Sequence, residues 1–511
     1  LAIAESEQVD SLHPGIGFLS EDPNFARLIR QHGINFIGPP VTSMETMGNK
    51  SNAINTTIGI GVPVVPGSHG VVASAERAAE IADMVGYPVL LKAVHGGGGK
   101  GIQVVNSAEQ IMGLFQQVST EARNAFGNGD LYIEKFVTSL RHIEAQVLRD
   151  THGETCVLGL RDCSVQRNNQ KLMEESGSTM LPAGLRDAVF AHARKIADAV
   201  DYVGAGTVEF IYDVPNEAIY FMEMNTRLQV EHPVTEAVTG VDIVEQQFEI
   251  AGGASIAGLG GDEDGYALEV RINAEKAVLD ADGKVSFVPT PGTITRCELP
   301  TRDDIQMISM AGEGKVVSPF YDSLIIQVIC KGADRMDTID RMSNYLEAVS
   351  IEGISTNVAL IQRILQDKVF RDGIYDTDFL PQFLNRIDAA DLIREIEQAS
   401  GSSSQALDLE ALIIEGTSEI KVLSPSTGVF YLTPSPADPE YVNVGDVIGT
   451  DDTICQMEAM KMFAPVTLST FSGTNGEIYA ADQRYEVMRI NQVTGQQVNE
   501  GDLLFVIRPA A

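Results

Sequence analysis

The sequence from residue 88 to residue 105 is PVLLKAVHGGGGKGIQVV, and this stretch decides the class of fold. An apolar run, Pro88–Ala93, enters a glycine-rich loop, and a second β-prone run, Ile102–Val105, follows it. The loop satisfies GxGxxG, but a Rossmann fingerprint needs a helix after the glycines, and a Walker A loop needs Ser or Thr after its lysine. The stretch therefore predicts a hairpin of two strands whose glycine loop closes over phosphates. Lys92, inside the apolar run, needs an anionic partner.

Two acidic residues farther along predict a metal site. Glu209 and Glu223 lie in β-prone runs that are joined by a turn at Pro215-Asn216, so the two runs are expected to be antiparallel neighbours. Like charges that face each other across a strand pair repel unless a cation lies between them. With Asn225 two residues on, the pair suits Mg²⁺ that bridges nucleotide phosphates. The alternative is a cross-strand pair of solvated acids.

Composition restricts the class of partner. The chain has 511 residues with 36 basic and 71 acidic side chains, a net charge of −35, which opposes binding to nucleic acid and to anionic membranes. Five cysteines without CxxC spacing predict reduced thiols in a cytoplasmic protein. No apolar run approaches the roughly 18 residues of a membrane span. The length predicts three or four domains.

The C-terminal part of the sequence contains an internal repeat. Gly428–Tyr431 recurs as Gly476–Tyr479, and Val442–Ile448 recurs as Val498–Leu504. Two copies of one hairpin unit predict a pseudo-twofold sandwich or flattened barrel. The wider spacing in the second copy predicts an inserted loop near Asp482–Val487. Before this module, the composition of Ser400–Ser404 is typical of a flexible linker.

A lysine lies where the two repeats join, in Met457-Glu458-Ala459-Met460-Lys461-Met462. In isolation this segment favours a helical turn with a solvated lysine, but its place between two β-repeats predicts a hairpin with Lys461 at the tip. It resembles the biotinyl carrier domain of biotin-dependent carboxylases, whose modified lysine sits in Ala-Met-Lys-Met, whereas lipoyl domains usually carry Asp-Lys-Ala. The resemblance implies covalent biotin on Lys461.

Longer motifs place the rest of the chain in a family. From about Ser11 to Leu384 the sequence resembles the ATP-grasp superfamily and, within it, the biotin carboxylases. The resemblance is carried by these motifs: His13–Glu21, Met47–Lys50, the glycine loop, Arg161–Arg167, Glu223–Pro233 and Arg271–Glu275.

The resemblance implies an α/β ATP-grasp fold with an α+β C-terminal subdomain, followed by a small all-β biotinyl/lipoyl-type flattened barrel. The chain begins inside a helical pattern, and we expect the family's first strand-helix-strand unit to precede Leu1. The expected segments are a remnant of the N-terminal domain (1–46), the ATP-grasp domain (47–245, with its glycine-rich lid at about 68–135), the C-terminal domain (246–386), a linker (387–420) and the carrier (421–509).

The resemblance also assigns roles to single residues. Those implied for ATP are Lys50, Lys92, Gly96, Gly97, Gly98, Gly99, Gly101, Glu134, Lys135, Val137, His142 and Gln166. Those implied for bicarbonate are Lys171, Arg227, Gln229 and Val230, and the implied metal ligands for Mg²⁺ or Mn²⁺ are Glu209, Glu223 and Asn225. The implied catalytic set is Glu231 as the base and Arg271 at the biotin ureido oxygen, with Lys171 and Arg227.

The function implied is ATP- and bicarbonate-dependent carboxylation of protein-bound biotin for a separate carboxyltransferase subunit. The segment from Phe430 onward resembles the protruding thumb of acetyl-CoA carboxylase carrier proteins, with an ordinary Pro-rich loop as the alternative. The resemblance favours acetyl-CoA or propionyl-CoA as the final acceptor, and pyruvate is the alternative acceptor. The expected partners are that subunit, a biotin protein ligase and a second copy of the chain in a homodimer or larger oligomer. Rival readings are a ligase without biotin, a lipoyl carrier and a non-enzymatic biotin display module.

Overall fold

The chain folds into two compact units. The computed structural model describes residues 1–94, 101–167, 170–177, 181–260, 263–279, 283–401, 412–435, 438–460, 462–471, 479 and 483–510. Unit 1 comprises Leu1–Glu269, Ile329–Thr338 and Ile374–Leu380, and unit 2 comprises Val270–Val328, Ile339–Gly373 and Pro381–Ala511. Among the described residues, no helix is both long enough and apolar enough to cross a membrane.

The helices of unit 1 are α1 (Ala2–Ser6), α2 (Pro23–Gln31), α3 (Val41–Met47), α4 (Lys50–Gly59), α5 (Ala75–Val85), α6 (Ala108–Phe126), α7 (Ala183–Ala199), α8 (His232–Thr239) and α9 (Ile243–Ala251). Its strands are β1 (Ser11–Leu12), β2 (Asn35–Phe36), β3 (Val89–Ala93), β4 (Ile102–Val105), β5 (Leu131–Lys135), β6 (Leu140–Arg149), β7 (Thr155–Arg167), β8 (Gln170–Gly177), β9 (Gly204–Asp213) and β10 (Ala218–Asn225).

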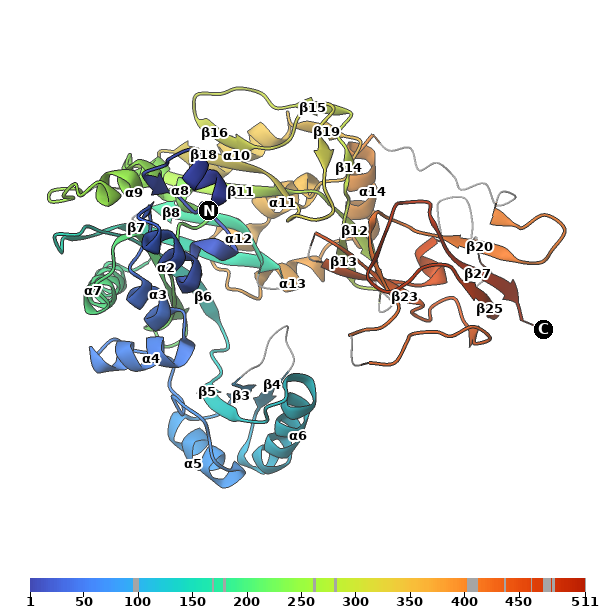
Figure 1. Ribbon diagram of the computed structural model, residues 1–511, viewed down its shortest axis with the longest axis horizontal. Coiled ribbons are helices and arrows are strands. Elements are labelled where there is room, and N and C mark those ends of the chain that lie inside the picture. The colour runs from blue at the N-terminus through green and yellow to red at the C-terminus, as the bar shows by residue number, and fades with distance from the viewer. Residues whose placement is uncertain are drawn as a thin grey trace. The chain divides into compact units, whose positions relative to one another are not determined.

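The predicted glycine-loop hairpin is present in unit 1. β3 pairs antiparallel with β4, with Lys92 opposite Ile102, and β5 lies on the other side of β3. Helices α5 and α6 pack against this small sheet (Figure 1). α5 begins where the Ser74 hydroxyl accepts a hydrogen bond from the Arg77 backbone N–H, and it ends at Gly86, whose positive φ of 79° suits glycine. The glycines at 96–99 lie outside the described residues.

The larger sheet of unit 1 has the order β10-β9-β6-β7-β8 and continues into the unit 1 ends of β11 (Tyr266–Asn273) and β18 (Leu324–Gly332). Because side chains alternate along a strand, β6 contributes side chains to both faces of the sheet. Its odd residues Ile143, Ala145 and Val147 form a core with α7. Its even residues, from His142 onward, point to the other face. Polar side chains on that face are therefore held by a strand that the apolar core fixes in place.

A buried carboxylate joins two late segments of the chain to this sheet. Glu175 on β8 accepts hydrogen bonds from Arg335 Nε at 2.6 Å, Tyr266 Oη at 2.5 Å and Tyr375 Oη at 2.6 Å. Burial alone would raise the pKa of Glu175, but Arg335 and the two phenols outweigh it and hold that pKa below its usual value. This cluster explains why residues 329–338 and 374–380 belong to unit 1.

Unit 2 has a first part of short strands and helices. Its elements are β12 (Glu275–Leu279), β13 (Val285–Pro289), β14 (Gly292–Thr293), β15 (Arg296–Glu298), β16 (Ile305–Ser309), β17 (Val316–Val317), β19 (Ser350–Glu352), α11 (Val358–Gln366), α12 (Lys368–Arg371) and α14 (Ala389–Ala399), with α10 (Arg335–Leu346) and α13 (Phe379–Leu384) shared between the units. Arg363 on α11 and Glu395 on α14 form a two-bond ion pair at 2.8 and 2.7 Å.

Ser400, the first residue of the predicted flexible linker, is packed against its neighbours. Ser400 is only 2% exposed, its hydroxyl donates to the Glu397 carbonyl, and its own carbonyl accepts from the Gly353 backbone N–H. Ser400 thus caps the C-terminus of α14 and is buried, although the Ser/Gly-rich sequence around it predicted a flexible segment. Residues 402–404 of the predicted linker lie outside the described residues.

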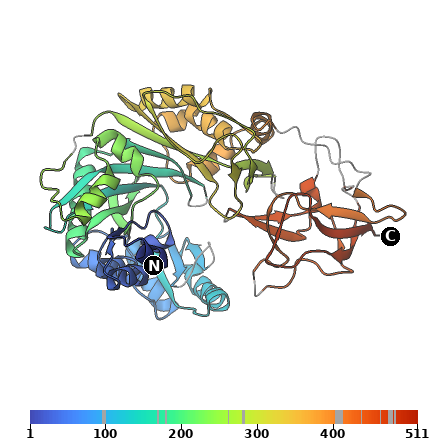
Figure 2. The same cartoon turned by 45° about the horizontal axis from the view of Figure 1, so that its top comes forward.

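The second part of unit 2 is an all-β module (Figure 2). Its strands are β20 (Ile420–Leu423), β21 (Gly428–Tyr431), β22 (Val447–Ile448), β23 (Cys455–Ala459), β24 (Met462–Val466), β25 (Tyr485–Ile490), β26 (Gln496–Val498) and β27 (Leu503–Pro509). They form two four-stranded sheets, β20-β27-β25-β22 and β24-β23-β21-β26, around an apolar core.

The internal repeat appears in this module as two matching turns. The Asn443 backbone N–H donates to Asp446 Oδ2 at 2.7 Å, and the Asn499 backbone N–H donates to Asp502 Oδ2 at 2.7 Å. Each turn contains a glycine at positive φ, Gly445 at 96° and Gly501 at 84°. In the other repeat, the first three of the four residues of the second copy, 476–478, lie outside the described residues. The inserted loop predicted as far as Val487 is wrong at its end, because β25 already begins at Tyr485.

The hairpin β23–β24 is the one predicted to present Lys461. Ala459 pairs with Met462, so a two-residue turn, Met460-Lys461, joins the strands. Met460 has a positive φ of 52°, which the first residue of a tight hairpin turn can adopt. Lys461 itself lies outside the described residues. The neighbouring strand contributes Tyr431, whose hydroxyl donates to Glu458 at 2.8 Å.

Candidate active site

The polar face of the large sheet collects buried, ionisable side chains. Glu144 on β6 lies opposite Glu209 on β9 and opposite Arg161 on β7 in the strand register. Glu144 and Arg161 are fully buried, and Glu209 is 4% exposed. Buried charges are stable only when each one is paired and hydrogen-bonded, so this face is a built polar site.

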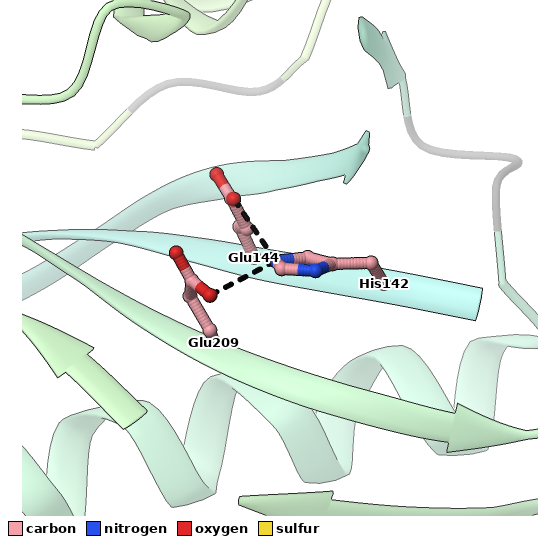
Figure 3. A group of neighbouring side chains, drawn as sticks. All are labelled: His142, Glu144 and Glu209. Carbon is pink, nitrogen blue, oxygen red and sulfur yellow. Dashed lines mark ion pairs between the residues drawn. The ribbon is translucent and has the colours of Figure 1, made fainter. Parts of the chain in front are cut away.

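His142 is held between two of these carboxylates (Figure 3). Its Nε2 lies 3.1 Å from Glu144 Oε1 and 3.1 Å from Glu209 Oε2. Burial alone would lower the pKa of His142, but the two carboxylates outweigh it and raise that pKa to about 10. The imidazole is therefore a cation at neutral pH. On its other side, Gln166 Nε2 lies 3.3 Å from His142 Nδ1, so two residues predicted for ATP are neighbours.

Lys171 joins the carboxylates to the predicted base. Its Nζ donates to Glu144 Oε1, lies 2.5 Å from Glu231 Oε1 and lies 3.6 Å from Glu209 Oε1. Burial opposes the charge on Lys171, yet Glu144 and Glu231 raise its pKa well above the usual lysine value. Glu231 is 3% exposed and precedes the first residue of α8. The ammonium of Lys171 therefore lies directly beside the carboxylate of the residue predicted to be the base.

The predicted metal ligands lie on adjacent strands. Glu209 and Glu223 are register partners on β9 and β10, as the turn between the strands predicted. Loss of water and the charge of Glu209 raise the pKa of Glu223, although Lys50, His142 and Lys171 partly offset this effect. Asn225 Nδ2 donates to Glu209 Oε1 at 2.6 Å, which leaves Asn225 Oδ1 directed elsewhere. Two carboxylates and an amide oxygen form a hard oxygen set that fits Mg²⁺.

A second set of potential ligand atoms, on His142, Glu144 and Glu209, also lies within 4.8 Å. It offers one nitrogen and two oxygen atoms, whereas Mg²⁺ prefers oxygen ligands alone, so the set of Glu209, Glu223 and Asn225 fits Mg²⁺ better.

Arg227 is oriented by a residue from the start of the chain. Its Nε donates to Glu21 Oε2 at 2.8 Å, and the Thr226 backbone N–H donates to Glu21 Oε1 at 3.0 Å. Arg227 NH2 also reaches Asn225 Oδ1 at 3.3 Å. The sequence placed Glu21 in a motif but gave it no role, and nothing local indicated a partner 206 residues away.

The residues predicted for ATP occupy two places in unit 1. Lys92 donates to Glu134 Oε2 at 2.6 Å, so these two residues predicted for ATP are paired with each other. Lys135 Nζ is bound to the carbonyl oxygens of Gly86 and Tyr87 at 2.9 and 3.0 Å. Lys50, at the start of α4, lies 5.8 Å from the ring centre of Tyr132. Of the others, Val137 is buried, and the Gly101 backbone N–H donates to Glu121.

The structure brings together the candidates on the polar face, namely His142, Gln166, Lys171, Glu209, Asn225, Arg227, Gln229 and Glu231. Val230 lies between the last two in sequence. Arg271 lies on the unit 2 part of β11, where its carbonyl accepts from Asn357 Nδ2, and its predicted part in the site stays a prediction. Two residues that the sequence did not single out, Glu144 and Arg161, lie at the centre of this face. The alternation His142-x-Glu144-x-Gln146 within an apolar strand was the available signal.

Comparisons with known proteins cover each part of the chain. Family models match as follows: "Biotin carboxylase, N-terminal domain" at residues 1–44, "Carbamoyl-phosphate synthase L chain, ATP binding domain" at 49–259, "Biotin carboxylase C-terminal domain" at 269–382 and "Biotin-requiring enzyme" at 420–507. Biotin carboxylase 1 of Bacillus subtilis (strain 168) is 42% identical over 385 residues, which cover 75% of this chain and 84% of that protein.

Two solved structures are informative. The biotin carboxylase domain dimer of Hydrogenobacter thermophilus 2-oxoglutarate carboxylase, in complex with MgADP, ADP and bicarbonate, has a TM-score of 0.66 and 42% identity, and covers 75% of this chain and 83% of that chain. A single-chain, multi-domain long-chain acyl-CoA carboxylase has a TM-score of 0.63 and 27% identity, and covers 100% of this chain and 45% of that one. The chain belongs to the biotin carboxylase family: it is an ATP-dependent ligase whose ATP-grasp body is fused to a biotinyl/lipoyl-type carrier domain.

Proposed function

We propose that the polar face of unit 1 deprotonates bicarbonate and directs it to the γ-phosphoryl group of ATP. The observation that carries this proposal is the position of Lys171 Nζ, 2.5 Å from Glu231 and also bonded to Glu144. Glu231 is the base, and Lys171, Arg227, Gln229 and Val230 surround the bicarbonate. The attack yields ADP and carboxyphosphate, which then releases CO₂ and phosphate.

Charge neutralisation supplies much of the rate enhancement. Lys50, Lys92 and the loop at Gly96–Gly101 bind the ATP phosphates, and their positive charge and N–H groups offset the negative charge that develops on the transferred phosphoryl group. Glu209, Glu223 and Asn225 hold Mg²⁺, which supplies further neutralisation of the phosphates. The relative from Hydrogenobacter thermophilus, which was solved with MgADP and bicarbonate, supports this assignment.

Lys461 would hold biotin, whose ureido nitrogen would accept the released CO₂ while the released phosphate takes the ureido proton, and Arg271 would stabilise the ureido oxygen. The pairing of Ala459 with Met462 supports this role for Lys461, because it leaves only Met460 and Lys461 to join the two strands. A biotin protein ligase attaches the cofactor. Tethering raises the effective concentration of biotin at the site.

The final acceptor is an acyl-CoA, acetyl-CoA or propionyl-CoA, processed by a separate carboxyltransferase subunit. The likeness to a long-chain acyl-CoA carboxylase along the whole chain supports this choice. Relatives named as subunits of 2-oxoglutarate and pyruvate carboxylases make those acids the alternatives. The dimeric relative supports a homodimer, and a cytoplasmic location follows from the charge and cysteine content.

The test is a steady-state assay of the purified chain with free biotin, ATP, Mg²⁺ and bicarbonate. The Glu231→Gln variant keeps the side-chain volume and removes the base, so kcat should fall by about 10²–10⁴-fold. Glu249→Gln, an exposed glutamate on α9, is the matched control and should keep the parent rate. Retained bicarbonate-dependent ADP formation in the Glu231 variant would place the base elsewhere. Purified carboxyltransferase subunits for each acceptor then identify which one receives the carboxyl group.

A further inference from the structure

Arg161 uses every hydrogen-bond donor that a guanidinium has, and it is fully buried. Its Nε donates to Glu144 Oε2 at 3.0 Å. The remaining four N–H groups have four different acceptors: Gln146 Oε1 at 2.8 Å, Thr235 Oγ1 at 3.0 Å, Thr207 Oγ1 at 3.0 Å and Gln229 Oε1 at 2.9 Å. A guanidinium has five N–H donors, so all are satisfied.

These bonds determine which way two neighbouring polar groups face. Because Arg161 occupies Gln229 Oε1, the amide nitrogen of Gln229 turns to Glu209 Oε1, at 2.8 Å. Because Arg161 occupies Glu144 Oε2, the other oxygen, Oε1, is left for Lys171, which in turn contacts Glu231. One buried side chain thus orients both the amide and the ammonium predicted to hold bicarbonate.

We infer that Arg161 is a positioning residue for bicarbonate, acting through Gln229 and through the Glu144–Lys171 pair. This inference rests on the bicarbonate roles proposed above for Lys171, Gln229 and Glu231. Arg161 does not itself touch the reacting atoms. Its planar fork fixes several acceptors at set angles, which the single ammonium of a lysine cannot reproduce.

A role confined to stability makes a different prediction. Within a buried network, loss of any one bond weakens folding, whichever partner is removed. A positioning role instead predicts different effects for different partners. Loss of the bonds to Gln229 and Glu144 should weaken use of bicarbonate, and loss of the bond to Thr235, on α8, should not. Thr235 is fully buried in the same network and therefore provides a matched control.

The experiment compares Arg161→Lys with Thr235→Val in the full chain. Arg161→Lys keeps the positive charge beside Glu144, so the variant retains the charge balance of the buried cluster. We expect kcat/KM for bicarbonate to fall by about 100-fold, because the substrate would no longer be held in the reactive position. KM for ATP and KM for free biotin should each stay within about twofold of the parent values. Thr235→Val should keep KM for bicarbonate within about twofold and lower Tm.

Three outcomes decide the matter. An unchanged kcat/KM for bicarbonate in folded Arg161→Lys overturns the inference. An equal fall in kcat/KM in Thr235→Val, at an equal loss of Tm, also overturns it and leaves a structural role. The Glu231→Gln variant distinguishes failure of the inference from failure of the proposed function. If Glu231→Gln remains active, the proposed bicarbonate site is wrong. If Glu231→Gln is inactive while Arg161→Lys has the parent activity, only the inference about Arg161 fails.

Discussion

The polar face of unit 1 and the all-β module are both built from strands, but their strands bury side chains of opposite character. On the polar face, strands bury charged groups such as Glu144, Arg161 and Glu209, each satisfied by several partners. In the module, the strands bury apolar groups such as Phe430 and Leu504, and the lysine proposed to carry biotin follows Met460 in the sequence. The charged groups that must be oriented lie within a sheet, whereas the lysine proposed to carry biotin lies in the segment that joins two strands.

The largest effect should come from the hairpin lysine. Lys461→Arg keeps the charge but removes the only amine at that turn that can form the biotinyl amide, so biotin attachment should disappear completely. Streptavidin blotting and intact mass measure this. Because the polar face is built from other residues, carboxylation of free biotin should continue at the parent rate. Streptavidin binding by the variant would refute the assignment of Lys461.

The next largest effect concerns the stability of unit 1. Glu175→Gln leaves the partly exposed Arg335 without its counter-charge, which should cost about 3 kcal/mol at pH 7, the lower end of the range for a buried pair. Because the folded state lowers the pKa of Glu175, its contribution is present above the usual glutamate pKa of about 4.3 and is lost as pH falls through the folded-state pKa. Urea denaturation of parent and variant should therefore converge on acidification. A constant difference between pH 7 and pH 3.5 contradicts this prediction.

A smaller effect is expected at the metal ligands. Glu223→Gln removes a charged ligand and also relieves the repulsion with Glu209, so the Mg²⁺ concentration needed for half-maximal rate should rise by about 10–100-fold. Glu217→Gln, in the exposed turn before β10, is the control. Titration of Mg²⁺ at saturating ATP measures the shift. A superimposable titration for the two variants would exclude Glu223 from the metal site.

The smallest effect should lie in the core of the module. Ile507→Val on β27 removes one buried methyl group and should cost about 0.5–1.5 kcal/mol. Free-biotin carboxylation should not change, because unit 1 supplies that site. Differential scanning calorimetry and the free-biotin assay together check both statements. A fall in the free-biotin rate would show that the two regions are coupled.

Local patterns allowed much of the fold to be predicted. The glycine-loop hairpin, the Glu209–Glu223 register and the repeated turns depend on residues close in sequence, where alternation and turn chemistry are visible. The ligase family followed from motifs that resemble its members. The role of Arg161, by contrast, depends on partners from β6, β9 and α8, which no local pattern joins.

Other features were missed for the same reason. Glu21 orients Arg227 across 206 residues, and Ser400 is packed although its neighbours are typical of a linker. Lys92 was expected to need an anion, and its partner in the structure is Glu134. In each case the sequence indicates that a partner is required, but only the tertiary structure identifies it.

The Glu175 cluster also has a consequence for synthesis of the chain. Its partners Arg335 and Tyr375 follow it by 160 and 200 residues. At a translation rate of about 5–20 residues per second, roughly 10–40 s pass between the emergence of Glu175 and that of Tyr375. During that interval the nascent sheet carries a carboxylate without its last phenol donor. Ribosome-bound chains that stop before Tyr375 should therefore be more sensitive to protease, and bind chaperones more, than chains that extend past it.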